Sequence, residues 1–307
     1  MAISQARAQI NGTWYNLTYN SSTGKYETTI TAPNVSSYNV NAGHYYPVII
    51  EATNTAGTIT TKNDTDATIG NSLKLTVKER VKPTIAITSP GSGAYVTNNK
   101  QPIVFQLRDE VNGSGLNIGS LVLKIDSGTA IGNASAGMVC NQVVNGYDCT
   151  YTPQTALGDG SHNITIDISD FDGNTATQVT RSFTIDTVPP VLNISSPSNS
   201  FITNIASLVV QGTTNDATSS PTTITIKLNN VDQGAVTITS GSFSKSITLA
   251  TGANTIIVTA SDAAGKTTAT TITGNLDTSA PNISAVTITP NPIDAGATMI
   301  ISVMVTG

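Results

Sequence analysis

Apolar and polar residues alternate along most of this chain with a period of two, which is the pattern of β-strands that bury one face. The alternation is clearest at residues 103–107, 121–125, 164–168 and 256–260, where every second residue is apolar. Thr, Ser, Val, Ile and Asn dominate, and no stretch keeps an apolar period of 3.6 residues. The pattern therefore predicts an all-β protein.

One strand–turn–strand phrase occurs three times. It reads Ala52–Thr58, Ile168–Asn174 and Ala260–Lys266, each with glycine as its sixth residue. Each copy follows an alternating apolar run and precedes a Thr-rich run, and glycine stands where a tight turn requires a positive φ. The phrase therefore predicts three equivalent hairpins.

Proline-marked restarts follow the three phrases at Pro83, Pro190 and Pro281, so successive restarts are 107 and 91 residues apart. A repeat that contains its own hairpin and is followed by its own restart proline indicates a string of similar domains. Units of roughly 100 residues have the size of an immunoglobulin-like β-sandwich. We therefore expect tandem immunoglobulin-like domains at residues 1–81, 82–187 and 188–279.

Residues 280–307 are too few for a fourth sandwich, so they predict a C-terminal docking strand or a partial fourth domain. The strand expected at residues 298–306 has one wholly apolar face, formed by Met299, Ile301, Val303 and Val305. An unpaired apolar strand exposes an edge that promotes pairing. We expect it to extend a sheet of domain 3 or of an adjacent subunit.

The charged fraction is 11% and the formal net charge is −5, so no basic face is available for nucleic acid or an anionic membrane surface. No apolar run approaches the length of a membrane-spanning helix. His44 and His162 are the only histidines, and neither lies in a recognisable nucleophile–base–acid set. We therefore expect no catalytic residues and no enzyme activity.

Residues 1–10 lack a basic region followed by an apolar region, so they do not resemble a secretory signal. Two hypotheses fit a Thr-rich string of sandwiches with such a start. The chain is a trimmed adhesin, or it is assembled in a cytoplasm and released by lysis, as a bacteriophage virion component is.

Several segments carry a resemblance to a known family, and they lie at residues 1–5, 17–20, 44–48, 63–68, 97–100, 159–162, 186–190, 212–216 and 286–292. Over nearly its whole length the chain resembles an Ig-like protein family of tailed phages and prophages of anaerobic Gram-positive bacteria, found among the tail genes. The resemblance implies a tail-associated structural protein in the virion whose final strand ends the chain. Similarity to Ig-like modules of bacterial surface adhesins is also expected.

Cys140 and Cys149 flank the hairpin dipeptide Asn145-Gly146. A strict two-residue loop at that dipeptide would set the cysteines two positions out of register. A four-residue loop over residues 143–146 would place them directly opposite each other and make a disulfide possible. Assembly in a reducing cytoplasm would oppose its formation, so both states stay open.

Aspartates near the second hairpin could supply oxygens to a calcium ion at a domain junction: Asp109, Asp167, Asp170, Asp172 and Asp186. Aspartate is also the ordinary turn residue beside glycine, and domain 3 keeps only Asp262 at its equivalent turn. We therefore expect no metal and no cofactor, with calcium as the alternative.

Domain 1 contains seven of the fifteen aromatic residues. Tyrosine and tryptophan anchor interfaces and also stack on sugars. The candidates for an interface or a glycan contact are Trp14, Tyr15, Tyr38, Tyr45 and Tyr46. For any single one of them, a place in the core is the simpler interpretation.

These observations lead to one main hypothesis: a non-enzymatic tail or baseplate decoration or spacer that adheres weakly to host glycan. Its expected partners are other tail or baseplate subunits, further copies of the chain in the particle, and host cell-surface polysaccharide. The alternative is a segment of a bacterial cell-surface adhesin or S-layer-associated protein. An accessory module of a carbohydrate-active enzyme would need a catalytic domain that this sequence does not show.

Overall fold

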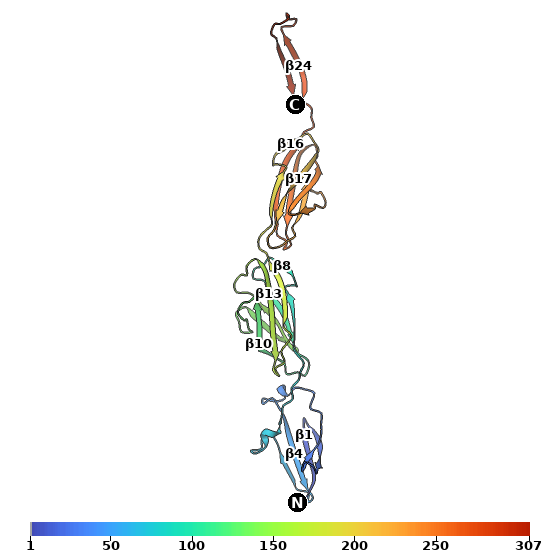
Figure 1. Ribbon diagram of the computed structural model, residues 1–307, viewed down its shortest axis with the longest axis vertical. Helices are drawn as coiled ribbons and strands as arrows, with labels where there is room; N and C mark the ends of the chain where they lie inside the picture. The colour runs from blue at the N-terminus through green and yellow to red at the C-terminus, as the bar shows by residue number, and fades with distance from the viewer. Residues whose placement is uncertain (1) are drawn as a thin grey trace. The chain divides into compact units, whose positions relative to one another are not determined.

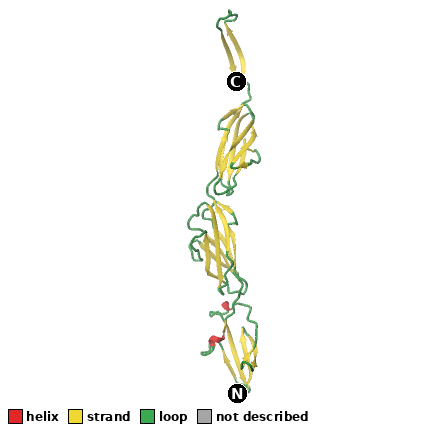
Figure 2. Cartoon of the chain, viewed as in Figure 1, coloured by secondary structure: helices red, strands yellow, loops and turns green. Residues whose placement is uncertain are grey.

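A computed structural model describes residues 2–307, and Met1, the first residue of the expected domain 1, lies outside the described residues. Strands dominate the cartoon in Figure 2. Within residues 2–307, the helical elements are two short 3-10 turns, η1 (Ser37–Asn39) and η2 (Gly70–Leu73). The all-β expectation is confirmed. The chain forms two compact units, Met1–Ile185 and Asp186–Gly307, which are described separately.

Domain 1 is one antiparallel sheet with the strand order β3-β2-β1-β4-β5, and β6 also pairs with β4. Its strands are β1 (Ile3–Ile10), β2 (Thr13–Asn20), β3 (Lys25–Glu27), β4 (Tyr46–Asn54), β5 (Ile59–Lys62) and β6 (Lys74–Leu75). Strands β1 and β4 lie side by side in Figure 1. The sequence analysis overlooked β1, although Asn11-Gly12 marks its hairpin with φ values of 49° and 80°.

The two-sheet sandwich expected for domain 1 is therefore not formed among residues 2–81. The physical reason is that residues 28–45 contain only the turn η1 and no strand that could build a second sheet. The buried hydrophobic side chains among residues 2–81 are few: Ala6, Ala8, Tyr46 and Leu73. Domain 1 therefore buries far fewer hydrophobic side chains than domain 2 or domain 3.

Domain 2 is a sandwich of two four-stranded sheets, β10-β13-β14-β8 and β11-β12-β9-β7. Its strands are β7 (Thr84–Ser89), β8 (Ala94–Val96), β9 (Ile103–Arg108), β10 (Leu116–Ile125), β11 (Met138–Val143), β12 (Gly146–Tyr151), β13 (Gly160–Asp170) and β14 (Val179–Ile185). Only the β8–β14 pair is parallel among these pairings. Two facing, mainly antiparallel sheets are the immunoglobulin-like arrangement that the repeat predicted.

Domain 3 repeats this plan with the sheets β15-β17-β21-β20 and β16-β23-β22-β18-β19. Its strands are β15 (Val191–Ser196), β16 (Phe201–Thr203), β17 (Ser207–Asn215), β18 (Thr223–Leu228), β19 (Val231–Asp232), β20 (Ile238–Thr239), β21 (Ser242–Thr248), β22 (Gly252–Ser261) and β23 (Thr267–Leu276). Strand β16 pairs in parallel with the last strand, as β8 does in domain 2. No sheet of residues 2–307 continues across Pro190.

The two cores consist of alternate residues on facing strands. In domain 2, Phe105 on β9 and Ile166 on β13 are completely buried. In domain 3, Ile226 on β18 and Val258 on β22 are completely buried. Each such side chain contributes about 1.5–3 kcal/mol through burial, before ordering costs are subtracted. The period-two pattern of the sequence is therefore the pattern of the two cores.

The repeated phrase forms the turns that the sequence predicted. Gly57, Gly173 and Gly265 have φ values of 82°, 93° and 85°. In each copy the backbone N–H of the third residue donates to the carbonyl of the seventh, at 3.1, 3.1 and 3.0 Å. The side-chain oxygen of the third residue accepts a backbone N–H of the same turn in all three copies. The third position therefore fixes each turn, as Asn54, Asp170 or Asp262.

Residues 282–306 form a hairpin in which β24 (Asn282–Thr289) pairs with β25 (Ile300–Thr306). The expectation that residues 298–306 extend a sheet of domain 3 is therefore wrong. The strand has a local partner because the restart after Pro281 is itself a strand. The docking candidates Met299, Ile301, Val303 and Val305 are 50%, 56%, 49% and 55% exposed.

Truncation of Ile166 to Ala should destabilise domain 2 by about 2–5 kcal/mol, because it leaves a cavity between the two sheets. The matched control is Val139→Ala on β11, where the side chain is 57% exposed. That control should change the stability by no more than about 0.5 kcal/mol. Hydrogen exchange of the β9 and β13 amides measures both effects, and equal protection in the two variants would contradict the core assignment.

Candidate functional site

Two groups of three acidic side chains stand out among residues 2–307. Glu79, Asp109 and Asp170 form the first acidic triad, in unit Met1–Ile185. In each triad, one carboxylate oxygen from every member lies within 4.8 Å of the others. Oxygen atoms this close together can share a proton or bind a cation.

The second acidic triad lies entirely in unit Asp186–Gly307 and consists of Asp186, Asp216 and Asp262. In both triads, the first acid precedes the first strand of a sandwich, the second follows the second long strand, and the third belongs to the repeated turn. The two triads therefore occupy equivalent positions in domains 2 and 3.

Hydrogen bonds hold the first triad in place. The amide of Asn174 donates to Glu79 Oε1 at 2.8 Å and to Asp170 Oδ2 at 2.7 Å. The backbone N–H of Gly115 donates to Asp109 Oδ2 at 2.8 Å. Asp109 Oδ1 is buried and has no hydrogen-bond partner. One carboxylate oxygen of this triad is thus buried without a hydrogen-bond donor.

The second triad is held in a similar way. Asp186 is 0% exposed and accepts hydrogen bonds from the Ser219 hydroxyl and from the backbone N–H of Val188. Asp216 Oδ1 accepts from the backbone N–H groups of residues 218 and 219 at 2.8 and 2.7 Å. Asp262 Oδ2 is buried without a partner.

The carboxylates of the first triad perturb one another. Burial, followed by a hydrogen bond shared with Asp170, raises the pKa of Glu79 to about 7. Burial, followed by the neighbouring Glu110 carboxyl group, raises the pKa of Asp109 to about 6. Burial opposes ionisation of Asp170 too, but hydrogen bonds from Glu79 and Asn174 outweigh it and lower the pKa of Asp170. Burial and the neighbouring carboxyl groups therefore favour the protonated forms of Glu79 and Asp109.

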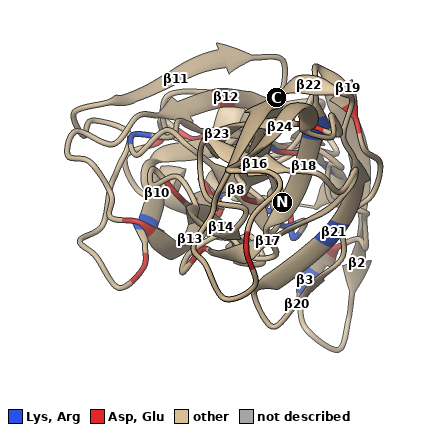
Figure 3. Ribbon diagram, turned by 90° about the horizontal axis from the view of Figure 1, so that it is seen from above, with Lys and Arg blue, Asp and Glu red and all other residues tan. Residues whose placement is uncertain are grey.

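Charged residues are sparse, as Figure 3 shows by short blue and red stretches on a largely tan ribbon. The ion pairs recorded between residues 2 and 307 are Arg7–Glu51, Lys62–Asp66, Arg108–Asp148 and His162–Asp126. None of them includes a member of either triad. The negative charge of the triads is thus not neutralised by a lysine or an arginine.

Of the calcium candidates from the sequence, the structure places Asp170 and Asp109 in the first triad. Asp167 accepts a hydrogen bond from Gln178, and Asp172 accepts bonds from Ser36 and from the backbone of Glu79. Asp186 belongs to the second triad and not to the first, which contains Asp109 and Asp170. Sequence reasoning missed Glu79 and Asp216, although both stand 30 residues from a partner acid, Asp109 and Asp186 respectively.

Four of the five aromatic candidates have structural contacts, and three of these contacts belong to Tyr46, Tyr45 and Tyr38. Tyr46 is only 3% exposed, and its hydroxyl donates to the carbonyl of Val35 at 3.2 Å. The Tyr45 hydroxyl donates to Asp64 at 2.7 Å, and this bond to the carboxylate raises the pKa of Tyr45. Tyr38 stacks on the Phe171 ring of domain 2 with the ring centres 4.3 Å apart.

Trp14 and Tyr15 are half-buried neighbours on β2, so they point to opposite faces of the sheet. The guanidinium of Arg7 lies over the Trp14 ring, 4.1 Å from its centre, and Arg7 also pairs with Glu51. Two adjacent strand residues cannot offer one common stacking platform. Trp14 and Tyr15 therefore cannot both belong to one sugar-binding face, and the five aromatic candidates do not share a single face.

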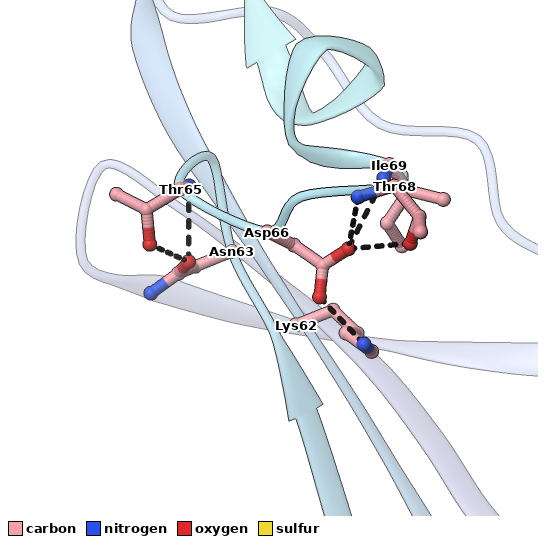
Figure 4. Close-up of polar contacts among 6 residues, drawn as sticks. All are labelled: Lys62, Asn63, Thr65, Asp66, Thr68 and Ile69. Carbon is pink, nitrogen blue, oxygen red and sulfur yellow. Dashed lines mark hydrogen bonds and ion pairs between the residues drawn. The ribbon is translucent and has the colours of Figure 1, made fainter.

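The loop after β5 carries the polar network drawn in Figure 4. Asp66 Oδ1 accepts from the backbone N–H groups of Thr68 and Ile69, while Oδ2 accepts from the Lys62 ammonium at 2.5 Å. The bond from Lys62 and then those from Thr68 hold the pKa of Asp66 far below its usual value. Because its acceptors are used locally, this network fixes a loop and offers no free ligand group.

The structure joins Cys140 and Cys149 by a disulfide. They are direct partners in the β11–β12 pairing, and Val143 pairs with Gly146 in the same register. The turn is thus formed by Val144 and Asn145, one position before the dipeptide that the sequence favoured. The register matches the four-residue alternative of the sequence analysis, with a tighter loop.

The two histidines lie in different environments. His44 has a φ of 61° and stacks on Tyr38 with ring centres 4.0 Å apart. His162 Nδ1 lies 2.9 Å from Asp126 Oδ2, and its Nε2 lies 2.8 Å from the carbonyl oxygen of Gly158. Burial acts against protonation of His162, but the bonds to Gly158 and Asp126 outweigh it and raise its pKa.

A shallow depression on domain 3 is lined by Thr, Ser, Pro and apolar residues that include Thr214, Pro221 and Ile238. No carboxylate, histidine or cysteine lines it. Between residues 2 and 307, no helix has both the length and the apolar character needed to span a membrane.

Comparisons with known sequences agree with this fold. Residues 92–187 match a Bacterial Ig-like domain family, and residues 190–278 match domain B of glucodextranase. These two matches fall on domains 2 and 3, and they show an Ig-like protein. No curated protein matches the chain.

Several solved structures are similar. The fibronectin(III)-like modules of CbhA from Clostridium thermocellum are 14% identical over 63% of this chain and 94% of theirs, with a TM-score of 0.39. An I-band fragment of titin is 11% identical over 88% and 86%, with a TM-score of 0.40. The Ig domains of DSCAM are 15% identical over 90% and 33%, with a TM-score of 0.38. At such low scores these likenesses carry no argument about function.

Replacement of His162 by Gln should remove a pH-dependent part of the stability of domain 2. The pKa of His162 is raised above 6.5 in the folded state, so its contribution is fully present below pH 6.5 and is lost as the pH rises through the folded value. The stability difference between the natural chain and His162→Gln should therefore be larger at pH 6 than at pH 9. Thermal unfolding at both pH values measures this, with His44→Gln as the control; a difference that stays constant with pH would contradict it.

Proposed function

We propose that the chain is a non-enzymatic structural spacer built from Ig-like domains, and that it serves in the tail or baseplate of a phage virion. One observation carries the spacer role: a bonded contact between domains 1 and 2, called the domain seam here. Domain 1 contributes Ser36, Tyr38 and Asn39, and the linker between β6 and β7 (residues 76–83) contributes Glu79. Domain 2 contributes Gly113, Ser114, Phe171, Asp172 and Asn174.

The domain seam combines one ring stack with several polar bonds. The Ser36 hydroxyl donates to Asp172 Oδ2 at 2.7 Å, and the backbone N–H of Glu79 donates to the same oxygen at 3.1 Å. The amide of Asn39 donates to the carbonyls of Gly113 and Ser114 at 3.2 and 3.3 Å. Such bonds restrict bending at the linker, which is the property that a spacer needs.

The place in a virion rests on the resemblance of the sequence to tail-associated Ig-like proteins. In such a particle the exposed apolar hairpin β24–β25 would bind another subunit, because its apolar residues have no cover in the single chain. Exposed aromatics such as Tyr19, which is 55% exposed, would supply weak contacts to host polysaccharide.

A segment of a cell-surface adhesin is the second candidate, and the Cys140–Cys149 disulfide favours it. Disulfides persist in oxidising compartments and are rare in a reducing cytoplasm. A protein exported to the cell surface would form this bond during export. A virion protein would form it after lysis.

Mass spectrometry of two fractions separates the candidates: virions purified after prophage induction, and peptides shaved from intact producer cells. A phage spacer is expected in virions at a stoichiometry comparable to other tail proteins. Its presence on intact cells together with its absence from virions would overturn the phage assignment in favour of the adhesin.

Removal of residues 284–307 should prevent incorporation into virions while domains 2 and 3 stay folded, because no residue of this segment is a member of either core. The measurement is the abundance of the shortened chain in purified particles, relative to the full chain. Hydrogen exchange of the two cores serves as the folding control. Normal abundance of the shortened chain would show that the hairpin is not the docking element.

Replacement of Tyr38 by Ala should loosen the domain seam, because an aromatic pair contributes about 0.5–1.5 kcal/mol. Opening of the linker should rise about two- to tenfold, and trypsin should cleave after Lys78 and Arg80 faster by that factor. Tyr19→Ala is the matched control, because Tyr19 contacts only Tyr26 among the aromatic rings. Equal cleavage rates in the two variants would show that the domain seam does not restrict the linker.

A further inference from the structure

Each acidic triad contains a carboxylate that is almost completely buried and has an oxygen without a partner. Asp109 is 9% exposed and its Oδ1 accepts no hydrogen bond; Asp262 is 7% exposed and its Oδ2 accepts none. A buried, unpartnered carboxylate oxygen is costly, because it loses hydration and gains nothing in return. Both oxygens belong to residues whose carboxylates converge, so one ligand bound at each triad would satisfy both.

The two triads also share their spacing in the sequence. Glu79 precedes Asp109 by 30 residues, and Asp186 precedes Asp216 by the same number. Glu79 and Asp186 each stand four residues before a restart proline. Turn chemistry alone would not require an acid in the linker at this fixed distance, since only the third member lies in the turn. Domain 1 has Asn54 at the turn position, and no third triad occurs within residues 2–307.

Three carboxylates without a lysine or arginine require a counter-charge when all are ionised. A divalent cation supplies it and also takes the free oxygens as ligands. Asp186 is 0% exposed, which leaves little room for the several waters that Mg²⁺ retains. Ca²⁺ accepts six to eight oxygens in flexible geometry, and the Ser219 hydroxyl beside Asp186 adds a further oxygen.

We propose that each acidic triad binds one calcium ion, so that the chain carries two equivalent calcium sites, one at the linker-proximal end of each sandwich. The bound ion joins the linker acid, Glu79 or Asp186, to the two acids of the sandwich that follows. It thereby fixes the linker segment on that sandwich. The proposal stands whether the chain acts in a virion or on a cell surface.

Calorimetric titration of the metal-depleted full chain with CaCl₂ tests the stoichiometry. Two ions per chain are expected, and Asp109→Asn and Asp262→Asn should each bind one. The matched controls are Asp167→Asn in domain 2 and Asp232→Asn in domain 3, which lie outside the triads and should keep both ions. A parallel titration with MgCl₂ should show weaker binding.

Thermal unfolding in EDTA and in CaCl₂ separates a ligand from a purely structural aspartate. Asparagine at position 262 retains the Oδ1 that accepts the backbone N–H of Lys266 at 2.8 Å, so the turn is preserved. Asp262→Asn should therefore melt no lower than the natural chain in EDTA and clearly lower in CaCl₂. An equal loss in both buffers would overturn the proposal. So would the absence of calcium binding by the natural chain at millimolar concentration, or two ions retained by both triad variants.

Discussion

The structure depends on one constraint: sheets with a single apolar face must cover that face. The chain has few charges and few aromatics, so its cores are built from Ile, Val, Leu and Phe at every second strand position. Domains 2 and 3 satisfy the constraint by folding two sheets against each other. Domain 1 has one sheet and few buried side chains, and the hairpin β24–β25 leaves its apolar residues exposed. Apolar residues without cover are therefore concentrated in the hairpin β24–β25.

A second constraint acts at the hairpin turns. The third residue of the repeated turn needs an acceptor for a backbone N–H, and asparagine or aspartate supplies it. Where that residue is aspartate, it has a second carboxylate oxygen: Asp170 Oδ2 accepts from the Asn174 side chain, and Asp262 Oδ2 is buried without a partner. One residue thus serves the local fold and a possible ligand site together. This dual role explains why Asp170 looked like an ordinary turn residue in the sequence.

The contacts around the first triad also belong to the domain seam. Glu79 bonds to Asn174 through its side chain and to Asp172 through its backbone, and Asp172 in turn accepts from Ser36 of domain 1. The first acidic triad and the domain seam therefore share Glu79 and its hydrogen bonds. A change in the charge of the triad would act on the stiffness of the linker, which relates the chemistry of the site to the proposed spacer role.

The sequence alone determined the strand content, the repeated turns and the restarts, because period-two alternation and positive-φ glycines are local properties. Local patterns could not count the sheets in domain 1, since pairing depends on whether residues 28–45 supply another strand. They also missed the partner of β25 and the convergence of Glu79 with Asp109 and Asp170. Those residues are 30 and 91 positions from Glu79, and only the tertiary structure brings their oxygens within 4.8 Å. The positions of the acidic triads depend on long-range packing, which no local pattern encodes.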